Sequence, residues 1–366
     1  MSWIDAYATQ AARTDRLKAK PDHLLLLAAG LVGEGGSLLA EAKKRSRDGE
    51  AYVGYHERIL EEFGDFLWYY VRLVSCSDPR LLATLSDRQP KKHDSPSGVV
   101  SLVHLSVSAS QAVTEMMGGT FKANFHGALV GVWNALCVAA ATVGIALSDA
   151  AARNVLKIRS RWPEERLYTP LFDEDFPVSE QLPRQLEADF GEEFQGVRTS
   201  VTLSSKGVAV GDSLTDNIRD PDGYRFHDIF HLSYAVHLGW SPVLRSLLHR
   251  KRKSNPIVDE AEDGARAAII EESVSAIVFG RAKSAGFFRG IEQLDYELLK
   301  TVQRLVAGFE VERVALWQWE VAILDGYRAF RKLRANGGGK VNVDVGGREL
   351  RYLTTAHSSL SDVIAL

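Results

Sequence analysis

Apolar residues recur at helical spacing through most of the first 165 residues of the chain. Leu24, Leu27 and Leu31 are examples, separated by three and four positions. This spacing places side chains on one face of a helix, so each such stretch predicts an amphipathic helix with an inward face. Together these stretches predict a helical bundle. Its helices are expected at 2–17, 22–46, 54–78, 99–117, 124–145 and 148–161.

A proline-rich stretch interrupts this pattern. The prolines between positions 163 and 183 favour an irregular connection, because proline lacks a backbone donor and breaks helices. We therefore predict a first domain over 1–165, a linker over 166–195 and a second domain over 196–366. Within the first domain, 79–123 is expected to be a linker or insertion, since it opens with a polar, proline-containing run.

The second domain opens with alternating apolar and polar residues. The alternation over 197–210 predicts a hairpin with its turn near Lys206-Gly207, and a second hairpin is expected across Gly346-Gly347. Helices are expected at 224–238, 241–250, 261–283 and 291–333. The predicted fold class is therefore mostly all-α: an N-terminal helical bundle, then a second, mainly helical domain with short β-hairpins.

Bulk composition agrees with two soluble domains. The chain has 366 residues, of which 45% are hydrophobic and 25% charged, as in ordinary globular proteins. Its formal net charge of -3 argues against general nucleic-acid binding, which needs a basic excess. A small basic pocket for a nucleotide remains compatible with this charge.

Three weaker features of the sequence indicate the cellular compartment of the protein. Cys76 and Cys137 both lie in apolar helical patterns, which argues against a disulfide framework. The first residues lack the apolar core of a signal peptide. The apolar stretch 128–147 contains Trp133 and Asn134 and lacks basic flanks, so we interpret it as a buried helix. We expect a cytoplasmic protein with no membrane partner.

Acidic residues on two neighbouring predicted helices form the most informative pattern. Glu62 and Asp65 are three positions apart, so their carboxylates share one helix face, and Glu61 offers an alternative partner for Asp65. Glu34 lies on the preceding helix. Carboxylates from facing helices are a common way to hold hard cations inside a bundle.

The same pair of acids is also typical of a solvated helix face. Here, however, Phe63 and Leu67 flank the acids, and Glu34 lies within the run LVGEGGSLL. Carboxylates among apolar residues are costly unless they are paired or metal-bound. The residues alone leave a metal site and a solvated face as alternatives.

These motifs resemble those of a known family. GLVGEGGSLLAEAKK at 30–44 and EEFGDFLWYY at 61–70 look like the signature helices of MazG-type nucleoside triphosphate pyrophosphohydrolases. AARNVLKIRSRWPEERL at 151–167 is similar to the family's later nucleotide-contacting helix. The resemblance covers about 20–165 and implies hydrolysis between the α and β phosphates, giving a nucleoside monophosphate and pyrophosphate.

By position, the resemblance also implies roles for particular residues. Glu34, Glu62 and Asp65 would be Mg²⁺ ligands, with Mn²⁺ as the alternative ion, and Glu61 would be a further ligand or would orient water. The remaining positions would contact the nucleoside triphosphate: Lys43, Lys44, Asn154, Lys157 and Arg161. MazG-type bundles usually build their sites at subunit interfaces, so a homo-oligomer, either a dimer or a tetramer, is expected.

One position departs from the family pattern. The first motif normally has a second glutamate three residues after the first, and this chain has Ser37 there. Glu41 lies two turns from Glu34, about 10 Å along the helix axis, and is too far to replace it. The departure keeps open a rival function, in which the domain binds nucleotides as a sensor or interaction module without turning them over.

The second domain carries its own candidate chemistry. His227 and His231 are four positions apart beside Asp228, and Glu271 lies on a later helix. Histidines with carboxylates bind zinc or iron, although the glutamate of the HExxH metalloprotease motif is missing. Neighbouring histidines in helices are also common as caps or core groups. The basic run 249–253 is likewise typical of a solvated helix end or of an anion pocket.

The second domain also resembles the C-terminal extension of some MazG-type proteins, a resemblance that does not specify an activity. We predict an acidic-histidine site there, with a second bound metal and a separate metal-dependent hydrolase activity as the alternative function for the chain. Its candidate residues are His227, Asp228, His231, Glu262, Asp263 and Glu271.

Overall fold

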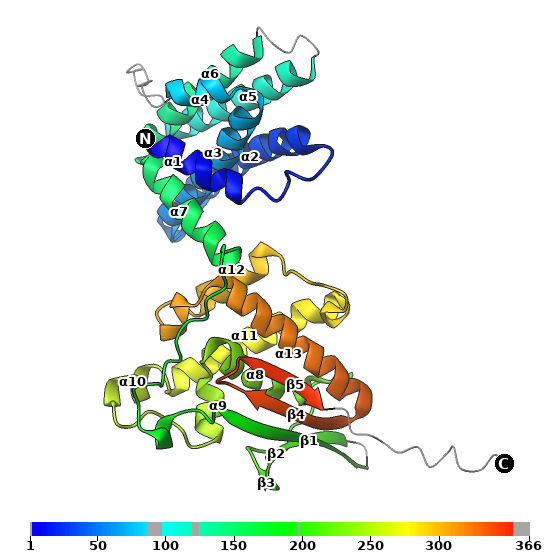
Figure 1. Ribbon diagram of the computed structural model, residues 1–366. Helices are drawn as coiled ribbons and strands as arrows, with labels where there is room; N and C mark the ends of the chain where they lie inside the picture. Colours follow the sequence, from blue (N-terminus) through cyan, green and yellow to red (C-terminus); the bar gives the residue numbers. More distant parts are fainter. Residues whose placement is uncertain (1, 86–96, 119–123, 197, 354–366) are drawn as a thin grey trace, which may run out of the picture. The chain divides into compact units, whose positions relative to one another are not determined.

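The computed structural model describes residues 2–85, 97–118, 124–196 and 198–353. The chain divides into two compact units, Met1–Glu164 and Glu165–Leu366. The first unit is helical and the second combines helices with one small sheet, which confirms the predicted fold class (Figure 1).

Helices near the predicted positions make up the described part of the first unit. They are α1 (Trp3–Arg13), α2 (His23–Asp48), α3 (Tyr55–Ser77), α4 (Pro79–Leu85), α5 (Gly98–Met117), α6 (Asn124–Thr142) and α7 (Leu147–Arg161). A short 3-10 turn, Gly49–Ala51, joins α2 to α3. Part of the expected insertion 79–123 is therefore helical, because α4 and α5 lie within it.

Helix α3 is the centre of the first unit. It packs against α1, α2, α4 and α7, and its aromatic face is fully buried at Phe63, Phe66 and Tyr70. Helix α2 also contacts α5, which pairs with α6. Two neighbours of α3 carry predicted site residues: α2, which precedes it directly in the sequence, and α7, which is distant in the sequence.

Two segments of this unit, His23–Ala51 and Asn124–Thr142, are long and apolar enough to cross a membrane by length and composition alone. Core helices of helical bundles pass the same test. Leu27, Leu31, Trp133 and Leu136 from these segments are among the buried residues of the bundle.

The first strand of the second unit lies in the stretch where a linker was expected. The strands are β1 (Gln185–Gln195), β2 (Arg198–Ser205), β3 (Val208–Ala209), β4 (Gly338–Asp344) and β5 (Glu349–Leu353). They form one antiparallel sheet in the order β3-β2-β1-β4-β5. The linker expected at 166–195 is therefore wrong for 185–195, where Ala188 and Phe190 are buried in the sheet at its centre.

The two predicted hairpins are both present, but β1 joins them into a single sheet. It pairs with β2 through Phe190 opposite Leu203, and with β4 through Ala188 opposite Val341. The sequence analysis did not predict this pairing, which links residues about 150 positions apart.

The described helices of the second unit lie between β3 and β4 in the sequence. They are α8 (Asp228–Leu238), α9 (Pro242–Leu247), α10 (Pro256–Ala261), α11 (Ala265–Ser284), α12 (Tyr296–Leu305) and α13 (Leu316–Asn336). Helices α8 and α13 pack on each other and on β4 and β5 (Figure 1). The helix expected over 291–333 is two helices, because Gly308 has a φ of 87° and a 3-10 turn follows at Glu310–Arg313.

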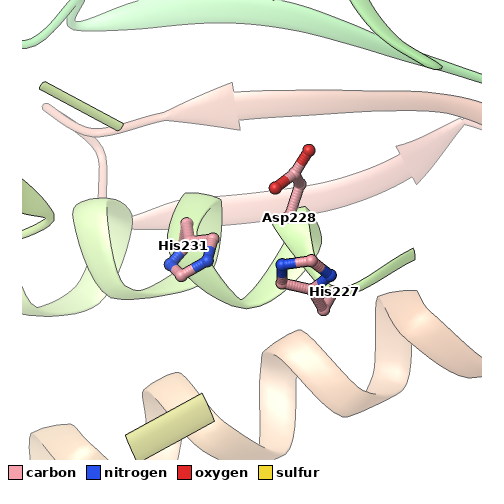
Figure 2. A group of neighbouring side chains, drawn as sticks. All are labelled: His227, Asp228 and His231. Atoms are coloured by element: carbon pink, nitrogen blue, oxygen red, sulfur yellow. The ribbon is translucent and has the colours of Figure 1, made fainter. Parts of the chain in front are cut away.

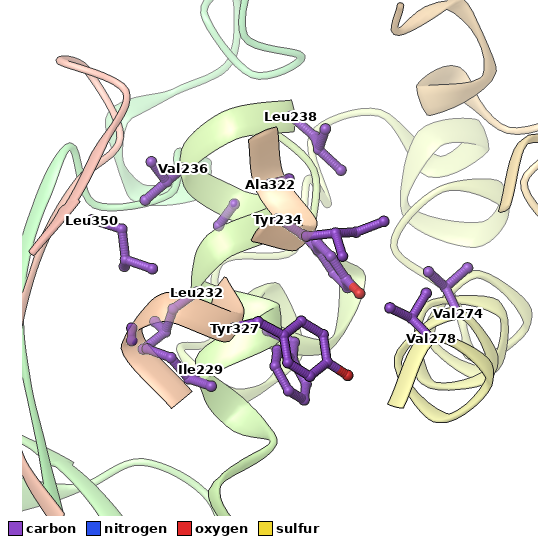
Figure 3. Packing of buried hydrophobic residues seen from close by; sticks show 14 of the residues in the cluster. Ile229, Leu232, Tyr234, Val236, Leu238, Val274, Val278, Ala322, Tyr327 and Leu350 are labelled. Atoms are coloured by element: carbon purple, nitrogen blue, oxygen red, sulfur yellow. The ribbon is translucent and has the colours of Figure 1, made fainter. Parts of the chain in front are cut away.

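Helix α8 is enclosed on all sides. All of its residues are buried, including Asp228 and His231. Its side chains Ile229, Leu232 and Tyr234 meet Tyr327 of α13 and Val274 of α11 in the core shown in Figure 3. A helix buried all round carries polar groups only where they are satisfied, which makes its histidines informative.

Candidate functional site

Three carboxylates converge in the first unit. Glu34 on α2 and Glu62 and Asp65 on α3 each place an oxygen within 4.8 Å of the other two. All three side chains are partly buried. The structure therefore brings together the three residues predicted as Mg²⁺ ligands, in a geometry that one cation can bridge.

Helix α7 supplies the polar neighbours of this cluster. The Asn154 side-chain amide donates to Asp65 Oδ1 at 2.7 Å, and the Lys157 ammonium bonds to both Asp65 oxygens. Lys157 also donates to Glu61 Oε1 at 3.5 Å. Asn154 and Lys157, predicted to contact nucleotide, are thus beside the carboxylates.

Asn154 is itself held in place by α1. The Tyr7 hydroxyl donates to Asn154 Oδ1 at 2.9 Å and lies 3.3 Å from the Gly64 carbonyl. Burial raises the pKa of Tyr7 well above its ordinary value, so the hydroxyl keeps its proton. Both polar ends of the Asn154 amide are occupied by protein, and Asn154 is a positioning residue for Asp65.

The absence of a β-carbon at Gly64 allows α7 to approach. A β-carbon at this position would lie 2.8 Å from the Ala150 carbonyl oxygen and 3.0 Å from Asn154 Cβ. Any larger residue would push α3 and α7 apart, and with them Asp65 and its two partners.

Crowding changes the protonation of the cluster. Burial, then the charges of Asp65 and Glu62, raise the pKa of Glu34 to about 8, while Lys157 opposes the shift. Three carboxylates this close cannot all ionise without a compensating cation. All the ligand atoms of the three carboxylates are oxygens, and their negative charge exceeds the positive charge nearby. A hard dication such as Mg²⁺ fits such a site.

The other predicted nucleotide contacts are Lys43, Lys44 and Arg161. Lys43 and Lys44 follow Glu34 on the same helix by nine and ten residues, about 14 Å along its axis. Lys44 pairs with buried Glu41 at 2.5 Å, and Tyr52 also bonds to Glu41. Arg161, at the end of α7, stacks its guanidinium on Trp162 at 4.4 Å. Lys43 and Lys44 therefore lie away from the carboxylates of their own chain.

A second group of candidate ligands lies at the start of α8. His227, Asp228 and His231 each place one ligand atom within 4.8 Å of the others, and all three are buried (Figure 2). Burial and then the neighbouring His231 lower the pKa of His227, whereas burial raises the pKa of Asp228. Burial alone would lower the pKa of His231, but Glu271 and Glu272 outweigh it and raise it.

Carboxylates of α11 face these histidines. Glu271, which is fully buried, accepts from His231 Nδ1 at 2.8 Å. Glu272 lies 3.3 Å from His231 Nε2 and 3.8 Å from His227 Nε2. Glu272 was not among the predicted site residues, although it directly follows Glu271 in the sequence.

Glu262 and Asp263, also predicted for this site, are not in it. Asp263 is buried in ion pairs with Arg252 at 2.7 Å and Arg245 at 3.6 Å. Glu262 accepts from the backbone of Glu310 at 3.0 Å. Arg252 also pairs with Glu310, so this part of the basic run 249–253 is structural. The prediction took these acids and the histidines from one charged segment, 211–282, and the fold separates them.

The comparisons with known proteins concern mainly the second unit. Residues 167–356, just over half of the chain, match the family model of the MazG C-terminal domain. Searches of curated proteins and of solved structures found no match.

Proposed function

The chain belongs to the MazG C-terminal domain family, and we propose that its first unit hydrolyses nucleoside triphosphates to monophosphates and pyrophosphate with Mg²⁺. Family membership associates the chain with nucleotide pyrophosphatase-type chemistry. The observation that carries the finer proposal is the convergence of Glu34, Glu62 and Asp65 within 4.8 Å.

These three carboxylates would hold Mg²⁺, or Mn²⁺ in its place. Bound there, the ion would neutralise phosphate oxygens and favour ionisation of the attacking water. Side chains of the protein would carry out the remaining steps. Asn154 fixes the orientation of Asp65, and Glu61, which shares Lys157 with Asp65, would accept a proton from water.

Lys157 would serve the phosphate. Its ammonium is partly buried and pairs with Glu61 and Asp65 at the carboxylate cluster. When dications neutralise these carboxylates, the ammonium would turn towards a phosphate oxygen and stabilise negative charge there. The Lys157 ammonium would thus pair with the carboxylates before substrate binds and with a substrate phosphate afterwards.

Product analysis of the full-length protein tests this proposal. The protein is incubated with Mg²⁺ and each common ribo- and deoxyribonucleoside triphosphate, and monophosphate, diphosphate, pyrophosphate and phosphate are separated. We expect monophosphate with pyrophosphate, lost in Glu62→Gln. Glu57→Gln is the matched control, because Glu57 is an exposed acid in the first turn of the same helix. Diphosphate with phosphate, or turnover unaffected by Glu62→Gln, would contradict the proposal.

Ser37 favours one alternative, a nucleotide sensor that binds without turnover. Ser37 has a hydroxyl at the position of α2 where the family pattern has a carboxylate. Nucleotide-dependent thermal stabilisation with no product would identify the sensor, because a ligand that binds the folded state shifts stability by mass action.

We also propose a homo-oligomer, a dimer or a tetramer. The outer face of α5 exposes Val99, Val103 and Val107 at four-residue spacing, with exposed fractions of 48%, 41% and 48%. Light scattering after size exclusion would give the mass, and a mass that falls to one chain in Val103→Lys would place the contact on α5. A wild-type mass of one chain would exclude this proposal.

A further inference from the structure

The hydrogen bonds of His227 and His231 determine which ring nitrogens carry protons. His227 Nδ1 lies 3.0 Å from the Tyr224 carbonyl oxygen, which can only accept. His227 therefore donates from Nδ1, and its neutral ring keeps a lone pair on Nε2.

His231 also donates from Nδ1. Its Nδ1 bonds to Glu271, whose two oxygens also accept from the Ser241 hydroxyl at 2.6 Å and the Val243 backbone at 2.8 Å. A carboxylate that accepts from several donors is ionised, so His231 Nδ1 carries the donated proton. His231 Nε2 is buried and makes no hydrogen bond among the described residues.

The Nε2 atoms of both histidines face one carboxylate. Glu272 lies 3.3 Å from Nε2 of His231 and 3.8 Å from Nε2 of His227. A metal ion between these atoms would take the place of any Nε2 proton and bind all three side chains. Two ligands about 2.1 Å from a tetrahedral ion are about 3.4 Å apart, which is close to both separations.

From this arrangement we propose that His227, His231 and Glu272 bind a divalent transition-metal ion, with Asp228 as a further ligand. Two imidazoles with carboxylates favour Zn²⁺ and its first-row neighbours over Mg²⁺, which prefers oxygen ligands alone. The site lies entirely in the second unit and is independent of the proposed pyrophosphohydrolase function.

The surroundings have the features expected around metal-bound histidines. Such histidines usually donate their other N–H to a carboxylate or a backbone carbonyl, as Glu271 and Tyr224 provide here. Tyr224 also stacks on the His227 ring, with centroids 4.4 Å apart. These contacts hold both rings with Nε2 directed at the same point.

An open pocket gives the ion a path from solvent. Its volume is about 560 Å³, and Glu272, Tyr224 and Ser273 are among its lining residues. Glu272 therefore belongs both to the pocket wall and to the ligand set, and its side chain is 43% exposed. A metal at this point is open to exchange and to small-molecule ligands from the pocket, unlike a closed structural zinc site.

Cobalt titration of the full-length protein tests the proposal. The protein is stripped with a chelator, dialysed, and supplied with excess Mg²⁺ to fill the carboxylates of the first unit. Co²⁺ is then added while visible absorption is followed, and Zn²⁺ is used to displace it. We expect one equivalent of Co²⁺ per chain, with imidazole-dependent bands that Zn²⁺ abolishes.

Variants identify the ligands. His227→Gln and His231→Gln are expected to weaken Co²⁺ binding by at least about 100-fold, and Glu271→Gln by about 10- to 100-fold. His104→Gln, an exposed histidine of the first unit, is the matched control and should bind as the wild type does. Glu62→Gln should also keep the cobalt bands, which separates this site from the proposed activity of the first unit.

The following results would contradict a metal site at these residues. Absence of the bands in the wild type, or bands unchanged in His227→Gln and Glu272→Gln, would overturn the proposal. Glu272→Gln is included because its partly exposed side chain can be replaced without unfolding the core, should His231→Gln fail to fold. An Nε2 proton on His231 seen by NMR with Zn²⁺ present would show a simple ion pair with Glu272 and would also overturn it.

Discussion

The Lys157 ammonium bonds to both oxygens of Asp65, although 92 positions separate the two residues in the sequence. This pair joins α7 to α3 at the point where three carboxylates meet. It places one permanent positive charge beside the cluster, and it partly offsets the rise in the pKa of Glu34. The protein therefore supplies part of the positive charge that the cluster needs.

Removing this charge should make the first unit depend on dications. In Lys157→Met, Asp65 loses its cationic partner, and we expect the free energy of unfolding to fall by about 1–3 kcal/mol, less than for a fully buried pair. Mg²⁺ should then raise the melting temperature of the variant more than that of the wild type. Lys43→Met, at an exposed lysine of α2, is the control. Equal Mg²⁺ responses in wild type and variant would contradict this account.

Gly64 should tolerate no side chain. The added β-carbon of Gly64→Ala would meet the Ala150 carbonyl oxygen at 2.8 Å. We expect a loss of about 1–3 kcal/mol in the free energy of unfolding by denaturant, with reduced pyrophosphohydrolase activity because α7 moves from Asp65.

Gly36 provides the matched control for this substitution. It lies inside α2, and a β-carbon added there would have no neighbouring atom within 4 Å, so Gly36→Ala should stabilise by about 0.5–1 kcal/mol. If Gly64→Ala were as stable as Gly36→Ala, the close approach of α3 and α7 would not limit this position.

The sequence was sufficient for helices and for local clusters. Helical periodicity located α2, α3 and α7, and the three-residue spacing of Glu62 and Asp65 predicted their shared face. Contacts between distant segments carry no such local signal. The bond from Tyr7 to Asn154 spans 147 positions and was not predicted.

The second unit gives further examples of contacts that local sequence patterns did not predict. Strand β1 does alternate at Leu186, Ala188 and Phe190, but the acidic residues between them and the nearby prolines obscured that pattern. Asp263 shares the charged segment 211–282 with the histidines, and this alone suggests a common site. Its partners Arg245 and Arg252 became evident only in the folded chain.

Asp173 should make the stability of the second unit depend on pH. Burial alone would raise the pKa of Asp173, but the hydrogen bond from Arg184 and the charge of Arg245, both at 2.8 Å, lower it below its ordinary value. Its pKa is thus lower in the folded than in the unfolded chain. The resulting stabilisation is present above the unfolded pKa, near 3.8, and is lost as pH falls through the folded pKa.

The variant Asp173→Asn tests this dependence. It removes the nearer of the two carboxylates that pair with buried Arg245 and leaves Asp263 at 3.6 Å, so we expect a loss of about 3 kcal/mol near neutral pH. Urea denaturation between pH 6 and about pH 3 should show a shallower fall in stability for the variant than for the wild type. Parallel pH profiles would show that Asp173 does not contribute.

Tyr7 should act on catalysis through Asn154. In Tyr7→Phe, Asn154 Oδ1 loses its donor inside the bundle, and we expect a cost of about 1–2 kcal/mol in the free energy of unfolding. Because Asn154 orients Asp65 and does not bind substrate in this account, kcat should fall and the Mg²⁺ requirement should rise, while KM for the nucleotide changes little. Tyr55→Phe is the control, since the Tyr55 ring contacts Arg45 away from the carboxylates. A rise in KM with kcat unchanged would instead place Asn154 in direct contact with the nucleotide.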